Sequence, residues 1–170
     1  MIWKWIGAAF ILIGCGGTGV SIAFRFYQEE RILSQLRDIL IFMENELKYR
    51  LTPLPELCHL AGKSTNGILS KTMAQLAEEL SRQVLPDPAS CMAAVLGNED
   101  GYSCIVRVLL QQMGKGLGRF DLSGQIQDLR CISERCKEEL LQVKNRRKQS
   151  AKSYQTLGFC AGAALAVLFI

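Results

Sequence analysis

The segment LIGCGGTG at residues 12–19 has the residue types and spacing that most directly suggest chemistry. Its glycines form G-x-G-x-x-G, a pattern that lets a backbone turn approach a dinucleotide pyrophosphate. Residues 12–15 also form a lipobox, in which cleavage of a signal peptide before Cys15 would expose that cysteine to lipidation. A third interpretation, called the helix-seam interpretation below, is a face of small residues through which a transmembrane helix packs on another helix. Small residues let helix backbones approach each other closely.

A dinucleotide site needs a strand before the glycine turn and a second strand with an acidic residue about 20 positions later. Here residues 26–51 contain no Gly or Pro, and Ser34 stands near the position of the acid. The same segment has apolar residues at helical spacing, which predicts an amphipathic helix with an inward stripe of Leu33, Leu36, Leu40, Met43 and Leu47. The sequence therefore argues against a cofactor at the glycine segment.

The other reactive residues do not form a recognisable site. His59 follows Cys58, but adjacent side chains on a helix do not face each other. Gly116 follows Lys115 in GKGLG, where a phosphate-binding Walker motif has Ser or Thr. The seven cysteines contain no C-x-x-C pair, which argues against a zinc site and a disulfide framework and favours a reducing compartment. We expect no catalytic residues, no metal, no cofactor and no enzymatic activity.

The distribution of charge predicts a domain between two membrane spans. Residues 5–24 and 153–170 contain no Asp, Glu, Lys or Arg. Since about 20 apolar residues cross a bilayer, we expect transmembrane helices at 5–24 and 154–170, with a helical domain at 25–153. The second stretch is short and rich in Ala and Gly, so a buried C-terminal helix is the alternative.

Periodicity between the spans predicts an all-α bundle of about six helices, with no alternating strand pattern. Thr52 and Asp87 each precede a proline and are predicted N-caps, and Asp121 or Ser123 is predicted to cap the last helix. The segment 114–121 is rich in glycine and is expected to be a break. After 26–51 the predicted helices are 53–61, 67–84, 88–96, 102–115 and a long last helix. The predicted inward residues are Ile68, Leu69, Met73, Leu76, Leu80 and Val84 in 67–84, Ile105, Val106, Leu109, Leu110 and Met113 in 102–115, and Ile126, Leu129, Ile132, Cys136, Leu140 and Val143 on one side of the last helix.

A basic cluster before the second span indicates the orientation in the membrane. No acidic residue follows Glu139, and the cluster consists of Lys144, Arg146, Arg147, Lys148 and Lys152. The positive-inside rule then places the helical domain in the cytoplasm and both termini on the far side. The same side chains are predicted to contact anionic lipid, and without an aromatic stacking platform they do not favour nucleic-acid binding.

Small residues three or four positions apart favour the helix-seam interpretation of the opening segment. The predicted packing residues are Gly14, Gly17, Thr18, Gly19 and Ser21 in the first span and Gly158, Gly162 and Ala166 in the second. A mature lipoprotein would continue from Cys15 as a polar tether, whereas the apolar run here continues to Phe24. Lipidation at Cys15, with the helical domain outside the cell, remains the alternative.

The assembled pattern resembles the stage III sporulation protein AB family of endospore-forming bacteria. The segments that carry the resemblance are ENELKYRLTPLPEL at 44–57, LLQQMGKGLGRFDLSGQIQDL at 109–129 and YQTLGFCAGAALAVLFI at 154–170. The positions that match the family pattern are Glu46, Tyr49, Thr52, Pro53 and Leu54, then Leu117, Gly118, Asp121 and Gln125, and finally Leu157 and Gly158.

The resemblance implies a non-enzymatic platform or scaffold subunit of a transenvelope, secretion-like complex between mother cell and forespore. Its helical domain would be similar to the cytoplasmic domain of the type II secretion F protein, in the mother-cell membrane around the forespore. The implied partners are the other subunits of the complex, including a secretion-type ATPase, together with membrane lipid and a second copy of the chain. Glu46, Tyr49, Arg119 and Asp121 are candidate partner or interhelix contacts.

Overall fold

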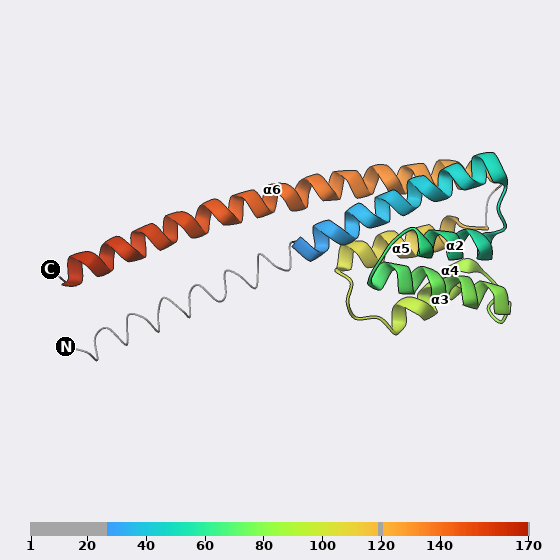
Figure 1. Ribbon diagram of the computed structural model, residues 1–170, viewed down its shortest axis with the longest axis horizontal. Coiled ribbons are helices and arrows are strands. Elements are labelled where there is room, and N and C mark those ends of the chain that lie inside the picture. Colours follow the sequence, from blue (N-terminus) through green and yellow to red (C-terminus); the bar gives the residue numbers. More distant parts are fainter. Residues whose placement is uncertain (1–26, 119–120, 170) are drawn as a thin grey trace. The chain divides into compact units, whose positions relative to one another are not determined.

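The computed structural model describes residues 27–118 and 121–169, and every regular element in that part of the chain is an α-helix (Figure 1). The predicted all-α fold is confirmed there, and so is the number of helices. The six helical segments are residues 27–50, α2 (Leu54–Lys63), α3 (Ile68–Arg82), α4 (Pro88–Gly97), α5 (Cys104–Gly116) and α6 (Leu122–Phe169).

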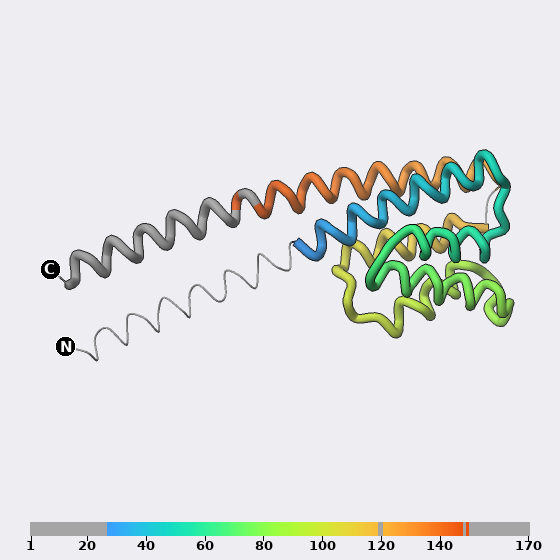
Figure 2. The backbone as a smooth tube through the Cα atoms, viewed as in Figure 1, coloured from blue at the N-terminus to red at the C-terminus, as the bar shows by residue number. Residues whose placement is uncertain are grey.

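The chain divides into two compact units. The larger unit is Arg31–Leu140, and the other combines Met1–Glu30 with Leu141–Ile170. Within the larger unit, the helix over residues 31–50 and the first part of α6 run side by side (Figure 2). Arg130 of α6 donates to Glu44 across this pair, with 2.6 Å between Nη2 and Oε1.

The predicted stripe of the first described helix forms part of the core. All five residues of that stripe are buried, and Ile39 is buried with them. On α6 the predicted inward residues Leu129, Ile132, Cys136 and Val143 are buried as well. The local 3.6-residue period therefore identified the inward faces of both helices.

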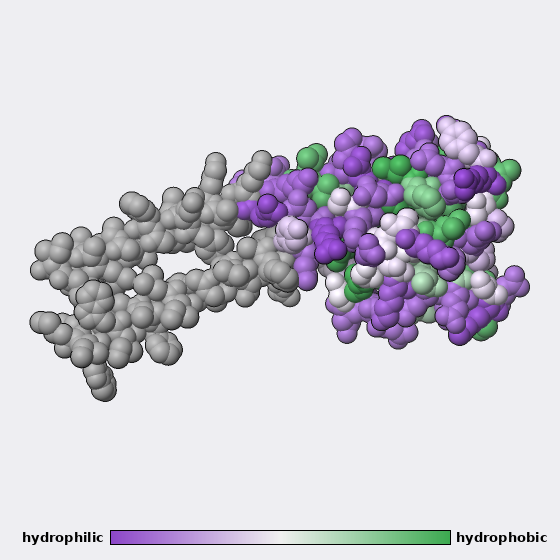
Figure 3. Space-filling view, viewed as in Figure 1, coloured by the Kyte–Doolittle hydropathy of each residue, from purple (hydrophilic) through white to green (hydrophobic). Residues whose placement is uncertain are grey.

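The shorter helices pack in sequence order, α2 on α3, α3 on α4 and α4 on α5. Their buried side chains include most of the predicted inward residues, and the exposed side chains on the face in Figure 3 are mainly hydrophilic. Buried residues that anchor this packing are Leu57 in α2, Leu69, Met73 and Leu76 in α3, Met92 and Leu96 in α4, and Val106, Leu110 and Met113 in α5.

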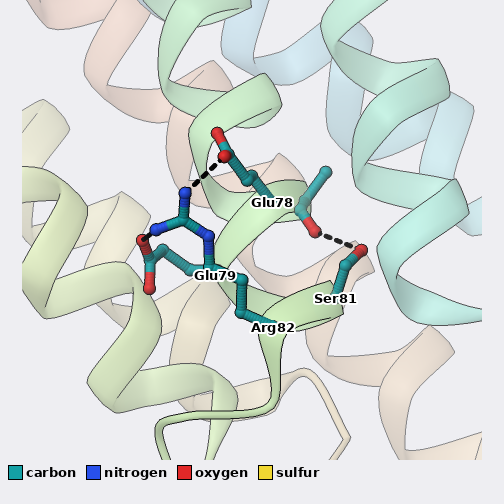
Figure 4. A network of polar contacts seen from close by, with 5 residues as sticks. Glu78, Glu79, Ser81 and Arg82 are labelled. Carbon is teal, nitrogen blue, oxygen red and sulfur yellow. Dashed lines mark hydrogen bonds and ion pairs between the residues drawn. The ribbon is translucent and has the colours of Figure 1, made fainter.

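The C-terminal end of α3 corrects the prediction for Val84. The helix ends at Arg82 because Gln83 takes a left-handed conformation with φ of 53°, and Val84 is 76% exposed. Arg82 ion-pairs with both Glu78 and Glu79, at 2.6 Å and 3.4 Å (Figure 4). Both acidic residues reach the same arginine because they lie three and four positions before it on the helix.

Two of the predicted N-caps are confirmed. The Asp87 carboxylate accepts a hydrogen bond from the Ser90 amide at 3.2 Å, which caps α4. Asp121, one of the two candidates for α6, accepts from the Gly124 amide at 3.1 Å.

The break predicted at 114–121 is confirmed in part, because α5 ends at Gly116 and α6 begins at Leu122. Gly114 and Gly116 are helical, and both stand where neighbouring helices approach closely. A Cβ on Gly114 would lie 2.6 Å from the Cβ of Met92 in α4, and one on Gly116 would overlap the Asp128 carboxylate of α6. The turn after α5 contains Gly118, whose φ of 72° suits a residue without a Cβ.

Candidate functional site

The turn between the first described helix and α2 lies within the first family-like segment, 44–57; with the last two residues of that helix, it is called the 49–53 turn here. Leu51 has φ of 54°, a strained conformation for a residue with a branched side chain. The Thr52 hydroxyl donates to the Glu46 carboxylate at 3.1 Å, and Arg50 pairs with the same carboxylate at 3.4 Å. The predicted cap is therefore wrong, since the N-cap of α2 is Pro53 and Thr52 instead stabilises the turn.

This arrangement presents an aromatic and an aliphatic side chain to solvent. Tyr49 is 73% exposed and Leu51 is 66% exposed. The Lys48 ammonium lies 5.2 Å from the centroid of the Tyr49 ring, within range of a cation–π interaction. The 49–53 turn thus combines apolar contact area with positive charge, which suits a protein partner with apolar and acidic side chains.

The other predicted contacts are engaged within the chain or lie outside the described residues. Glu46 holds Thr52 and Arg50, and Asp121 caps α6. Arg119 lies outside the described residues. The role of all four residues in partner binding stays a prediction. Of the three described, Tyr49 and Asp121 are exposed and Glu46 is partly buried.

Sequence reasoning missed the network that holds the turn between α4 and α5, residues 97–103. Arg107 of α5 donates to the carbonyl oxygens of Leu96 and Glu99, at 2.8 Å and 2.6 Å. The Tyr102 hydroxyl lies 2.7 Å from the Thr72 hydroxyl of α3, and both residues are buried. Burial, with a smaller contribution from nearby Glu99, raises the pKa of Tyr102 to about 12.

Lys71 of α3 adds an ion pair of 2.7 Å with the Glu99 side chain, and Gly101 packs against Ile68. These partners lie about 30 residues apart in the chain, so no local pattern could have indicated them. The 97–103 turn is fixed from two helices and has a structural role.

The basic cluster predicted to contact lipid is partly neutralised by an acidic residue. In the smaller unit, Arg147 and Lys144 lie 2.7 Å and 3.8 Å from the two carboxylate oxygens of Glu30. Arg146 donates to Gln142 at 3.4 Å. The side chains of Lys148 and Lys152 lie outside the described part, and lipid contact by the cluster stays a prediction.

The predicted membrane spans also stay predictions. Gly14, Gly17, Thr18, Gly19 and Ser21 lie outside the described residues, as do the side chains at positions 158, 162 and 166. Over the part of the chain that is described, no helix has both the length and the apolar character that crossing a membrane requires.

The described cysteines are free thiols, and they differ in access to solvent. Cys58, Cys91 and Cys136 are buried, whereas Cys104 and Cys131 are exposed. Burial raises the pKa of both Cys58 and Cys136 to about 12, so neither supplies a thiolate near neutral pH. Within residues 27–118 and 121–169, no three His, Cys, Asp or Glu side chains are placed to hold a metal ion.

The described fold places the chain in the class of all-α helical bundles, and the comparisons with known proteins define its family. The model of the stage III sporulation protein AB family matches residues 4–170. The chain therefore belongs to the stage III sporulation protein AB family.

One relative and one solved structure agree with this assignment. Stage III sporulation protein AB of Bacillus subtilis (strain 168) is 25% identical over 176 residues, which cover 98% of this chain and 99% of that protein. A solved structure of a stage III sporulation protein AB has a TM-score of 0.62 at 18% identity, and the match covers 72% of this chain and 98% of the other. That structural likeness supports the fold.

Proposed function

We propose that this chain is a non-enzymatic platform or scaffold subunit of a secretion-like complex that spans the envelope between mother cell and forespore. The observation that carries the proposal is the family match, which extends over residues 4–170. The exposed 49–53 turn supplies a surface on which another subunit can dock, and a secretion-type ATPase is among the proposed partners.

The proposal is tested by isolating the affinity-tagged chain from sporulating cells and identifying the proteins that accompany it. We expect other subunits of the sporulation complex to be recovered, and a Tyr49→Ala variant to recover them less well. Tyr27→Ala is the matched control, because Tyr27 is also exposed but lies in the other unit. Recovery of the chain alone from membranes in which those subunits are present would contradict the proposal.

We further propose a two-span arrangement in the mother-cell membrane around the forespore, with the helical bundle in the cytoplasm. Exposed Cys104 and Cys131 are suitable reporters, whereas buried Cys58 and Cys91 would label poorly on either side. In protoplasts, a membrane-impermeant maleimide should modify these exposed thiols only after the membrane is opened. Modification in intact protoplasts would place the bundle outside.

The second candidate function is a surface lipoprotein, which the lipobox at residues 12–15 favours. Intact mass spectrometry separates the two candidates. The platform predicts an unprocessed chain, whereas the lipoprotein predicts loss of residues 1–14 and acyl chains on Cys15.

A further inference from the structure

An open groove runs between α5 and α6 on the larger unit. It consists of two adjoining cavities of about 340 Å³ and 350 Å³, which share Gln112 and Arg135 as lining residues. Apolar side chains of α5 and α6 line it, namely Ile105, Val108, Leu109 and Ile132, and Val108 is 45% exposed. The groove thus offers apolar contact area.

The charged side chains are distributed unevenly along the groove. Lys115 and Asp128 line one end, Arg135 lies where the two cavities meet, and Glu138 and Glu139 line the other end. Arg135 donates to Gln112 Oε1 across the groove at 2.9 Å. In the described part of the chain, Lys115, Glu138 and Glu139 make no ion pair, so their charges are available to a ligand.

A groove in which a cation lies beside an acidic end can be complementary to itself after a two-fold rotation. Arg135 and Glu139 are separated by about one turn of α6, roughly 6 Å along the helix axis. If two copies cross antiparallel at this point, Arg135 of each copy faces Glu139 of the other, and the exposed apolar side chains meet between them. This is the residue-for-residue reciprocity that a two-fold interface requires.

We propose that the α5–α6 groove is a self-complementary interface between two copies of this chain. The proposal rests on the charge pattern and the apolar lining of the groove, and it does not depend on the proposed platform function. Arg135 and Glu139 fix the antiparallel direction, because a parallel pairing would place like charges together.

Charge reversal tests the pairing directly, with the purified full chain in mild detergent and native mass spectrometry as the readout. Lys115→Glu combined with Arg135→Glu should leave only acidic charges in the groove and weaken dimerisation at least tenfold. Reversing the acidic end with Glu138→Lys and Glu139→Lys should weaken it similarly. An equimolar mixture of the two variants should restore dimers that contain one chain of each kind.

The matched control for the Glu138 and Glu139 variant is Glu78→Lys with Glu79→Lys, which makes the same change in net charge on α3. This control should dimerise as the unaltered chain does, and circular dichroism checks that every variant folds. In a background with Ser at positions 15 and 160, a short bis-maleimide should also join Cys104 of one copy to Cys131 of the other. Loss of either thiol should remove the cross-linked dimer.

Three outcomes would overturn the proposal. They are an unaltered chain that stays monomeric at about 100 μM, single-end variants that dimerise normally, and a mixture that forms no mixed dimers. If a different protein occupies the groove, the unaltered chain is monomeric, and each of the two charge-reversal variants loses that protein. Recovery of the sporulation subunits is measured separately, so failure of the dimer leaves the proposed platform function intact.

Discussion

The 49–53 turn and the 97–103 turn both follow a helix and both carry a tyrosine, yet the two tyrosines have opposite environments. Tyr102 is buried and bonded to Thr72, whereas Tyr49 is 73% exposed. Other helices hold the 97–103 turn through Arg107, Thr72 and Lys71. In the 49–53 turn, Thr52 and Arg50 both bond to Glu46, which lies on the helix that precedes the turn. Contacts with residues distant in the sequence therefore bury the tyrosine of the 97–103 turn. The tyrosine of the 49–53 turn is exposed and available to a partner.

Removing the Arg107 side chain should have the largest effect on this contrast. The guanidinium donates to two partly buried carbonyl groups, and Arg107→Ala leaves both without this donor. We expect a loss of about 2–3 kcal/mol in the free energy of unfolding. Chemical denaturation measures it, and Arg130→Ala is the control because its ion pair with Glu44 is exposed. An equal loss in the two variants would show that the 97–103 turn does not depend on Arg107.

Tyr102→Phe should have the next largest effect. The substitution preserves the ring but leaves the buried Thr72 hydroxyl without its partner, which costs about 1–2 kcal/mol. Thr72→Val should cost a similar amount, and the double variant should cost less than the sum because no unpaired hydroxyl remains. Strict additivity in this double-mutant cycle would mean that the two hydroxyl groups do not interact.

The same tyrosine should make stability depend on alkaline pH. The pKa of Tyr102 is raised from 10.0 to about 12 in the folded chain, chiefly by burial. Between these values the unfolded chain loses the proton and the folded chain keeps it. Stability is therefore unaffected by this group below pH 10, and it falls by up to about 1.4 kcal/mol per pH unit above that. Chemical denaturation at a series of pH values from 9 to 12 measures this. The free energy of unfolding should fall less steeply with pH for Tyr102→Phe than for the unaltered chain.

The sequence predicted the parts of the fold that depend on local spacing. The stripe from Leu33 to Leu47 is buried, as the spacing of its apolar residues at the helical period predicts. Asp87 and Asp121 cap helices because their acceptors reach amides only three residues away. The helices and two of their starts could thus be read from short segments.

Interactions with a longer range account for what the sequence did not predict. Thr52 bonds to a carboxylate six residues earlier rather than capping α2. Gly114 lies directly against Met92 of α4, and no composition rule anticipates this contact between two helices. Of the candidate contacts, Tyr49 was identified from the family-like segment, whereas its exposure and the strained Leu51 beside it follow from the folded turn.

Leu51→Gly should have the smallest effect on stability and the most informative effect on binding. Glycine adopts a φ of 54° without the strain that a leucine bears, but it also increases the entropy of the unfolded chain. These effects oppose each other, so the free energy of unfolding should change by less than about 1 kcal/mol. The variant also removes an apolar side chain that is 66% exposed. Like Tyr49→Ala, it should therefore reduce recovery of the partner subunits. Gln83→Gly removes comparable strain at φ of 53° on α3 and should leave that recovery unchanged. If Leu51→Gly retains the partners fully, the exposed side chains of the 49–53 turn are not the docking contact, and the strained backbone there serves only to connect two helices.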